Sequence, residues 1–164
     1  MNPNSRLKPT KDFKYYKRDL PHYEDPGSFY FITFTTIGDL ELSDNAKDIV
    51  FNAIKFHADK KYKLYAYVVM KTHVHVILSP ISALKDSLFS LAQITHSIKS
   101  YSANKVNEAM DRTGKVWLDE NYDRIIRDDY DFFEKMNYII HNPLKAGLVK
   151  QPEVYKWLFY KGYD

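Results

Sequence analysis

The 164-residue chain contains no cysteine, which excludes disulfide bonds, a thiolate zinc site and a cysteine nucleophile. It has only five glycines, and they form no glycine-rich phosphate loop, so we expect no nucleotide cofactor. No apolar run approaches the ~20 residues needed to cross a bilayer, so we expect no membrane association. The first 20 residues contain no apolar segment of the kind found in secretory signals. These absences favour a soluble intracellular protein.

Aromatic residues, by contrast, are abundant at 16%, and hydrophobic residues make up 45% of the chain. This composition and length favour a single ordered domain with a substantial core. The net charge is only +3, but six of the first 20 residues are Lys or Arg against two Asp. We therefore divide the chain into a basic arm, residues 1–22, and one domain, residues 23–164. Cations mixed with aromatics suit single-stranded nucleic acid, although a solvated arm explains them equally well.

The pattern of apolar residues predicts alternating strands and helices. Strands are expected at 28–37, at 63–70 and 73–80 as a hairpin, and within 116–127. Helices are expected from Ser43 to about residue 60, at 83–110 with a break near 101–102, and at 129–140. This order fits one α+β domain, a ferredoxin-like split βαβ antiparallel sheet with helices packed on it.

Two histidines form the sharpest local feature. His73 and His75 lie two apart in a predicted strand, so their side chains share one face of the sheet. Two neutral imidazoles on one face can bind a divalent metal, but the spacing alone favours a pair of half-exposed histidines on the solvent face of a sheet. A metal site would need a third ligand, which the triplet itself does not supply.

A second candidate pair is Tyr138 and Asn142, four residues apart and so on one face of a helix. Because Pro143 disfavours a helical conformation for the residue before it, the residues alone favour Asn142 as the N-cap of a final short helix. Tyr138 is one of 14 tyrosines, so composition gives no reason to single it out.

Together these features resemble a known family. The sequence MKTHVHVIL at 70–78, followed by NYIIHNPLKAGLV at 137–149, is similar to single-tyrosine HUH transposases, and most closely to REP-associated tyrosine transposases. Further similar segments span residues 17–160: RDLPH at 18–22, YFITF at 30–34, IKSY at 98–101, GKVW at 114–117 and YDRIIR at 122–127. One departure is Lys71-Thr72 before the histidines, where family members commonly have Pro and then Asn or Glu.

The resemblance implies a DNA endonuclease and strand transferase with a central HUH strand. It implies Tyr138 as the nucleophile that forms a 5′-phosphotyrosine, and His73, His75 and Asn142 as ligands of Mg²⁺ or Mn²⁺. It also implies single-stranded or hairpin DNA as the partner and the bacterial cytoplasm as the location. Relatives include both homodimers and proteins that act alone, so the oligomeric state stays open.

Four cations are candidates for nucleic-acid binding: Arg18, Lys99, Arg124 and Arg127. Strand alternation places Arg124 and Arg127 on opposite faces, so we expect at most one of them to face the site. Trp117 is interpreted as a core residue in preference to a base-stacking one. Two alternatives to the transferase remain: a non-catalytic single-strand binder with a vestigial site, and a metallohydrolase without a covalent intermediate.

Overall fold

The computed structural model describes residues 14–17, 21–24, 27–84 and 87–162. Its centre is a five-stranded antiparallel sheet in the order β8-β3-β5-β4-β9. The strands are β3 (Tyr30–Thr35), β4 (Tyr62–Val69), β5 (His73–Pro80), β8 (Tyr122–Ile125) and β9 (Leu158–Tyr160). Near the N-terminus, β1 (Lys14–Lys17) pairs with β2 (Pro21–Glu24). The proposed basic arm, including Arg18, lies largely outside the described residues.

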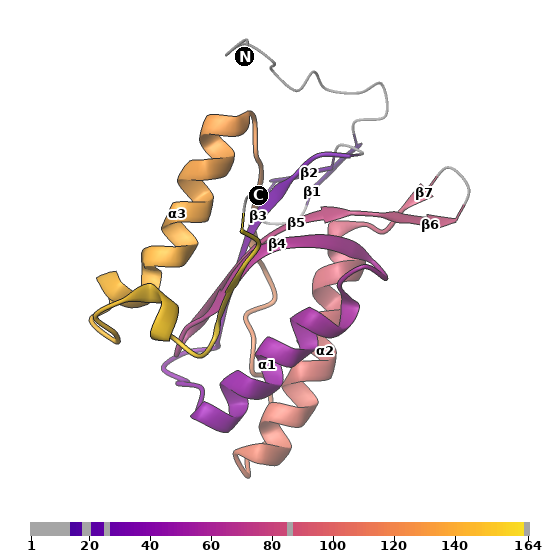
Figure 1. The fold of residues 1–164 in the computed structure, drawn as a ribbon. Helices are drawn as coiled ribbons and strands as arrows, with labels where there is room; N and C mark the ends of the chain where they lie inside the picture. The colour runs from indigo at the N-terminus through magenta and orange to yellow at the C-terminus, as the bar shows by residue number, and fades with distance from the viewer. Residues whose placement is uncertain (1–13, 18–20, 25–26, 85–86, 163–164) are drawn as a thin grey trace.

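Helices cover both faces of the sheet. Helices α1 (Asp44–His57) and α2 (Leu91–Ala109) lie together on one face, and α3 (Asp129–Lys145) lies on the other (Figure 1). A short 3₁₀ helix, η1 (Pro152–Val154), leads into β9. The strand order β8-β3-β5-β4 and the element order β-α-β-β-α-β are those of a ferredoxin-like domain, with β9 added at one edge. The α+β prediction is therefore confirmed, and β5, which carries both histidines, is the central strand.

Local sequence explains where the first two helices begin. The Ser43 hydroxyl accepts a hydrogen bond from the Ala46 N–H and caps α1, as predicted. A full capping box between Ser90 and Gln93 starts α2. The predicted start near residue 83 was therefore wrong, and residues 82–84 and 87–88 form the short paired strands β6 (Ser82–Leu84) and β7 (Ser87–Leu88). The predicted break near residue 101 was also wrong, because α2 is continuous.

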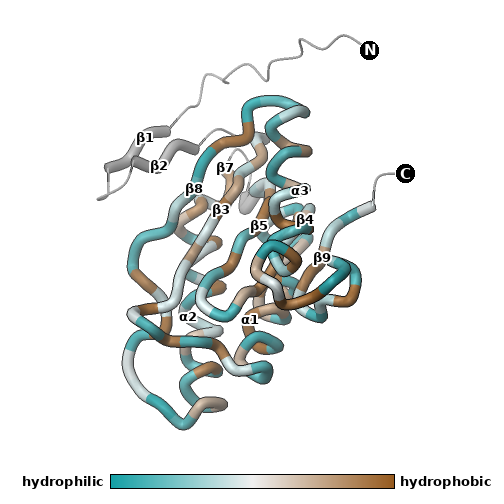
Figure 2. Tube along the Cα trace, turned by 90° about the vertical axis from the view of Figure 1, so that its left-hand side faces the viewer, coloured by the Kyte–Doolittle hydropathy of each residue, from teal (hydrophilic) through white to brown (hydrophobic). Residues whose placement is uncertain are grey.

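The core lies between the sheet and the helices. Figure 2 shows hydrophobic and hydrophilic residues alternating along the helices, as expected when one face of each helix is buried. Trp117 is 4% exposed, donates its Nε1–H to Ser102 Oγ at 3.0 Å and packs edge-on to Phe34. The interpretation of Trp117 as a core residue is confirmed.

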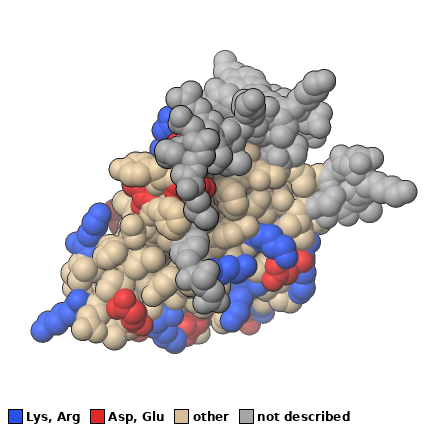
Figure 3. Space-filling view, turned by 45° about the horizontal axis from the view of Figure 1, so that its top comes forward, with Lys and Arg blue, Asp and Glu red and all other residues tan. Residues whose placement is uncertain are grey.

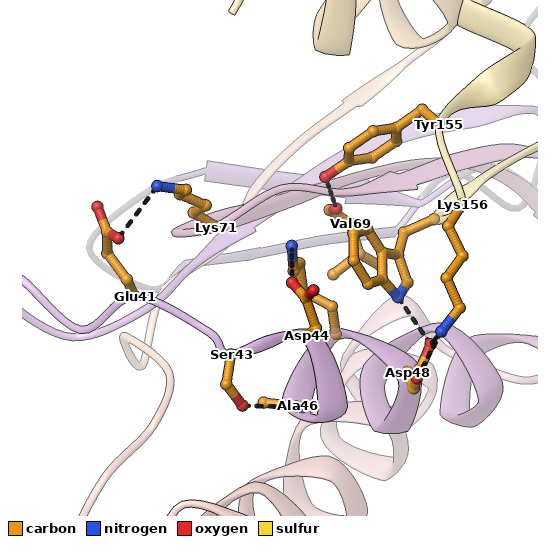
Figure 4. Close-up of polar contacts among 11 residues, drawn as sticks. Glu41, Ser43, Asp44, Ala46, Asp48, Val69, Lys71, Tyr155 and Lys156 are labelled. Atoms are coloured by element: carbon orange, nitrogen blue, oxygen red, sulfur yellow. Dashed lines mark hydrogen bonds and ion pairs between the residues drawn. The ribbon is translucent and has the colours of Figure 1, made fainter. Parts of the chain in front are cut away.

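The segment around η1 closes one edge of the fold against α1. The Tyr155 hydroxyl donates to the carbonyl of Val69 at 2.9 Å. Asp48 on α1 accepts hydrogen bonds from Lys156 Nζ and Trp157 Nε1, both at 2.8 Å (Figure 4). These contacts join residues that are far apart in the sequence and support the position of β9.

Charges of both signs are mixed on the face of the molecule seen in Figure 3. Figure 3 shows Lys and Arg side chains interspersed with Asp and Glu around one face. Among the described residues, no helix is long and apolar enough to cross a membrane.

Candidate active site between the sheet and α3

The central strand places two imidazoles side by side. The rings of His73 and His75 are 4.8 Å apart between centroids, on the sheet face that α3 covers. In each case Nδ1 contacts a threonine hydroxyl: Thr72 Oγ1 for His73 at 3.2 Å, and Thr33 Oγ1 for His75 at 2.6 Å. Thr33 can reach His75 because β3 pairs with β5 in a register that sets these two residues opposite each other. These contacts occupy Nδ1 of both rings, and in His75 they leave Nε2 as the nitrogen for another ligand.

Helix α3 brings Tyr138 and Asn142 to the same place. The Tyr138 ring lies edge-on to His75 with 5.1 Å between centroids, and the Asn142 side chain hydrogen bonds to His73. The expectation that Asn142 caps a separate final helix was wrong: α3 continues through Pro143 to Lys145. The helix continues because Pro143 removes only one backbone hydrogen bond and its ring is buried. Asn142 therefore lies within α3, one turn after Tyr138.

Phe31 forms the apolar wall of the site. Its ring stacks on His75 at 5.5 Å and meets Tyr138 edge-on at 5.9 Å, measured between centroids. Phe31 is 5% exposed, whereas Tyr138 is 39% exposed. The tyrosine thus packs one part of its ring against the site and remains accessible from solvent.

Burial favours the neutral form of both imidazoles. It lowers the pKa of His75 to about 3, with a further contribution from neighbouring His73. Burial also lowers the pKa of His73, opposed by its hydrogen bond with Asn142. Neutral imidazoles are the form that binds metal ions.

The donor set fits a divalent cation. His75 Nε2 is buried and has no hydrogen-bond partner among the described residues, which is costly unless a ligand completes it. With a ring nitrogen of His73 and the carboxamide of Asn142, which hydrogen bond to each other, it offers two nitrogens and an oxygen. The described residues contain no group of three His, Cys, Asp or Glu side chains placed to hold one metal ion. Asn142 is therefore the third protein ligand that the two histidines would need.

The two candidate arginines converge on one buried carboxylate. Asp131 is 6% exposed, accepts hydrogen bonds from Arg124 Nη2 on both its oxygens, and accepts another from the Arg127 N–H at 3.1 Å. Arg127 lies beyond the end of β8, so the strand alternation on which the expectation of opposite faces depended does not extend to it. These contacts attach the first turn of α3 to the end of β8.

Lys99 is tied to a loop on the far side of the sheet. Its Nζ donates to the carbonyls of Leu118 and Asp119 at 2.5 and 3.1 Å, and to Asn121 Oδ1 at 2.9 Å. It lies on α2, so the structure does not bring it to the histidines. Of the four cations singled out from the sequence, Arg18 lies outside the described residues.

Sequence reasoning missed several residues around the site. Phe31 and Thr33 lie on β3 and contact His75. Only the pairing register of β3 with β5 places them there. Lys135 has a 19% exposed side chain with Nζ 5.9 Å from the Phe31 ring centroid, and Lys145 Nζ lies 5.6 Å from the Tyr138 centroid. Both lysines share a helical face with Tyr138, three residues before it and seven after it, and this spacing could have identified them.

Comparison with solved structures identifies the fold. The structure of a REP-associated tyrosine transposase bound to a REP hairpin matches with a TM-score of 0.68 at 22% sequence identity, over 87% of this chain and 82% of that one. A protein from Deinococcus radiodurans R1, provisionally described as a transposase, matches with a TM-score of 0.46 at 17% identity, over 68% of this chain and 87% of that one. The chain therefore has the fold of the REP-associated tyrosine transposase, the group that its motifs resemble. No protein-family model and no curated protein matches the sequence.

Proposed function

We propose that this protein is a metal-dependent single-stranded DNA endonuclease and strand transferase with Tyr138 as its nucleophile. The observation that carries the proposal is the meeting of Tyr138 and Asn142, from α3, with His73 and His75, from β5. A half-open phenol beside two neutral imidazoles and a carboxamide can supply the nucleophile and the metal ligands for phosphoryl transfer to a tyrosine.

In the proposed reaction the Tyr138 oxygen attacks a backbone phosphorus atom. The new bond joins the phenolic oxygen to phosphorus, and the bond from phosphorus to the 3′ oxygen breaks. The phenol loses its proton, the departing 3′ oxygen gains one, and a 5′-phosphotyrosine and a free 3′-hydroxyl result. Because one phosphate ester replaces another, a 3′-hydroxyl can reverse the step and join strands.

Each residue has a part in this step. Phe31 and His75, which stack on each other, both pack edge-on to the Tyr138 ring, which limits the directions in which its oxygen can point. Thr33 and Thr72 orient the imidazoles through Nδ1. His73, His75 and Asn142 would hold Mg²⁺ or Mn²⁺, which supplies charge neutralisation at the phosphate oxygens. Lys135 and Lys145 add positive charge near the same phosphate.

The DNA partner we propose is a single strand next to a hairpin. The solved transposase of the same fold is bound to a REP hairpin, and the motifs of this chain resemble that group. The cations Lys145, beside the Tyr138 ring, and Lys135, beside the Phe31 ring, fit a polyanionic strand.

The test is a covalent-adduct assay. Purified protein is mixed with 5′- or 3′-labelled single-stranded oligonucleotides that carry hairpins from its own genome, in Mn²⁺ or Mg²⁺. The expected result is a DNA–protein band on a denaturing gel with the label 3′ of the break, together with a released fragment carrying a 3′-hydroxyl. Tyr138→Phe and a chelator should each remove the adduct, and Tyr130→Phe is the matched control because Tyr130 is an exposed tyrosine of the same helix.

The other outcomes separate the alternatives. Cleavage that persists in Tyr138→Phe without an adduct would identify a metallohydrolase. Binding with neither cleavage nor adduct, on every hairpin tested, would identify a non-catalytic binder.

A further inference from the structure

A second feature lies on the opposite face of the sheet from Tyr138. Helices α1 and α2 pack side by side there (Figure 1) and leave between them a cavity of about 610 Å³. This size is within the range of about 300–1,000 Å³ that is usual for small-ligand sites. The proposed strand-transfer chemistry makes no use of this groove.

Two exposed aromatic rings line the groove, one from each helix. Phe56 on α1 is 64% exposed, and Tyr101 on α2 is 55% exposed. Single exposed aromatic residues are common, but two that line one cavity from different helices form a concentrated apolar surface. Polar side chains also line it, among them Asn52 and Ser100, which can hydrogen bond to the edge of a planar ligand.

The margin of the groove is basic. Lys105 lines it, Lys61 Nζ donates to the lining Ser97 Oγ at 2.6 Å, and Lys60 Nζ lies 3.7 Å from the Phe56 ring centroid. His57 and His96 are also among the lining residues. None of the described lining residues is acidic, although Lys105 pairs with Glu108 at 2.9 Å.

Partly exposed aromatic rings flanked by cations, with Lys60 Nζ over one side of the Phe56 ring, are complementary to a ligand with a planar π system and a phosphate. An acidic protein segment would pair with the lysines, but its carboxylates would not stack on the two aromatic rings. A base with its phosphate satisfies both, because every base has a π face and stacking on aromatics tolerates any sequence. The lysines then meet the phosphate backbone.

We propose that the α1–α2 groove binds an unpaired nucleotide of a single-stranded nucleic acid, with its base against Phe56 and Tyr101 and its phosphate near Lys61 and Lys105. The groove lies on the sheet face away from α3, so it is a binding site separate from the one that contains Tyr138. The inference rests on the groove alone and does not depend on the chemistry of Tyr138.

The test measures binding with cleavage blocked. Fluorescence anisotropy of a labelled 12-nucleotide thymidine strand is recorded with the full chain in EDTA, for the wild type and for Phe56→Ala, Tyr101→Ala and their combination. We expect each single change to weaken binding by about 5- to 100-fold, the range found when one stacked base is lost. Tyr130→Ala is the control, because this ring is 80% exposed but lies on α3, and it should leave the affinity unchanged.

The charge component has its own readout. The slope of log affinity against log salt is negative. Lys105→Met should reduce its magnitude by about 0.7, as expected for one lost phosphate contact on a single strand. Free thymidine monophosphate should compete poorly with the strand. Equal competition per nucleotide would assign the groove to a free nucleotide and would overturn the proposal.

Two further results would overturn it. One is unchanged affinity in the Phe56→Ala/Tyr101→Ala double variant with its melting temperature preserved. The other is a dimer that dissociates in that variant, seen by sedimentation, while affinity for the strand is retained; the groove would then be a contact between two copies of the chain. Because EDTA suppresses the adduct reaction, a failure of the Tyr138 assay changes none of these outcomes.

Discussion

Tyr138 lies edge-on to His75, with 5.1 Å between their ring centroids, although one residue is on α3 and the other on the central strand. This relationship depends on the position of the whole helix. Two turns before Tyr138, Asp131 attaches the first turn of α3 to Arg124 on β8 and to the Arg127 N–H. The geometry of the candidate site is therefore sensitive to a residue that does not touch it.

Asp131→Asn should weaken this attachment, because it removes a buried carboxylate that accepts charge-assisted hydrogen bonds. We expect a loss of about 1–3 kcal/mol in the free energy of unfolding, measured by urea denaturation. Adduct formation should slow by about 10- to 100-fold, because the nucleophile is misplaced. Asp129→Asn is the control, since it removes a charge from the same helical turn at an exposed position. Equal rates of adduct formation in the two variants would contradict the positioning role of Asp131.

Thr33→Val should weaken metal binding while keeping the shape of the side chain. It removes the hydroxyl that contacts His75 Nδ1 at 2.6 Å, so the imidazole loses the contact that fixes its orientation. Mn²⁺ affinity, measured by electron paramagnetic resonance of the free ion, should fall by about 10- to 100-fold. Thr33→Ser retains the hydroxyl and should restore most of this affinity. If serine and valine behave alike, Thr33 does not orient the histidine.

Much of the fold could be predicted from short-range patterns. The β4–β5 hairpin, the Ser43 cap and the order of strands and helices follow from alternation, spacing and capping. The start of α2 could not be placed by periodicity alone, because residues 83–89 are apolar enough to extend a helical pattern. The capping box at Ser90 and Gln93 is the local signal that marks the true start.

The candidate site shows where sequence reasoning stops. The alternation of His73 and His75 predicted their common face, and the structure confirms it. The rule about residues before proline predicted the wrong role for Asn142, because tertiary packing keeps α3 helical through Pro143. Arg124 and Lys99 also looked like phosphate contacts, yet both have hydrogen-bond partners within the fold that only long-range structure reveals.

Lys99→Met tests whether that lysine supports the fold or binds DNA. Its ammonium group donates to the carbonyls of Leu118 and Asp119 and to Asn121, so its removal leaves these acceptors without that donor. We expect the free energy of unfolding to fall by about 1–3 kcal/mol in urea. The salt dependence of DNA binding should not change. A drop of about 0.7 in the salt slope with normal stability would instead assign Lys99 to phosphate binding.

Asp48 should make the stability of the fold depend on acidity. The hydrogen bond from Lys156 lowers the pKa of Asp48, partly opposed by desolvation and assisted by the hydrogen bond from Trp157. Because the folded pKa is below the ordinary value of 3.8, the carboxylate stabilises the fold above that pH, and this contribution is lost as the pH falls through the lower folded value. Asp48 is 39% exposed, so screening by solvent limits the contribution to about 1 kcal/mol or less. Asp48→Asn should therefore lower the free energy of unfolding at pH 7 and differ less from the wild type at pH 3. A constant difference for Asp48→Asn at both pH values would mean that packing, and not its charge, sets the effect.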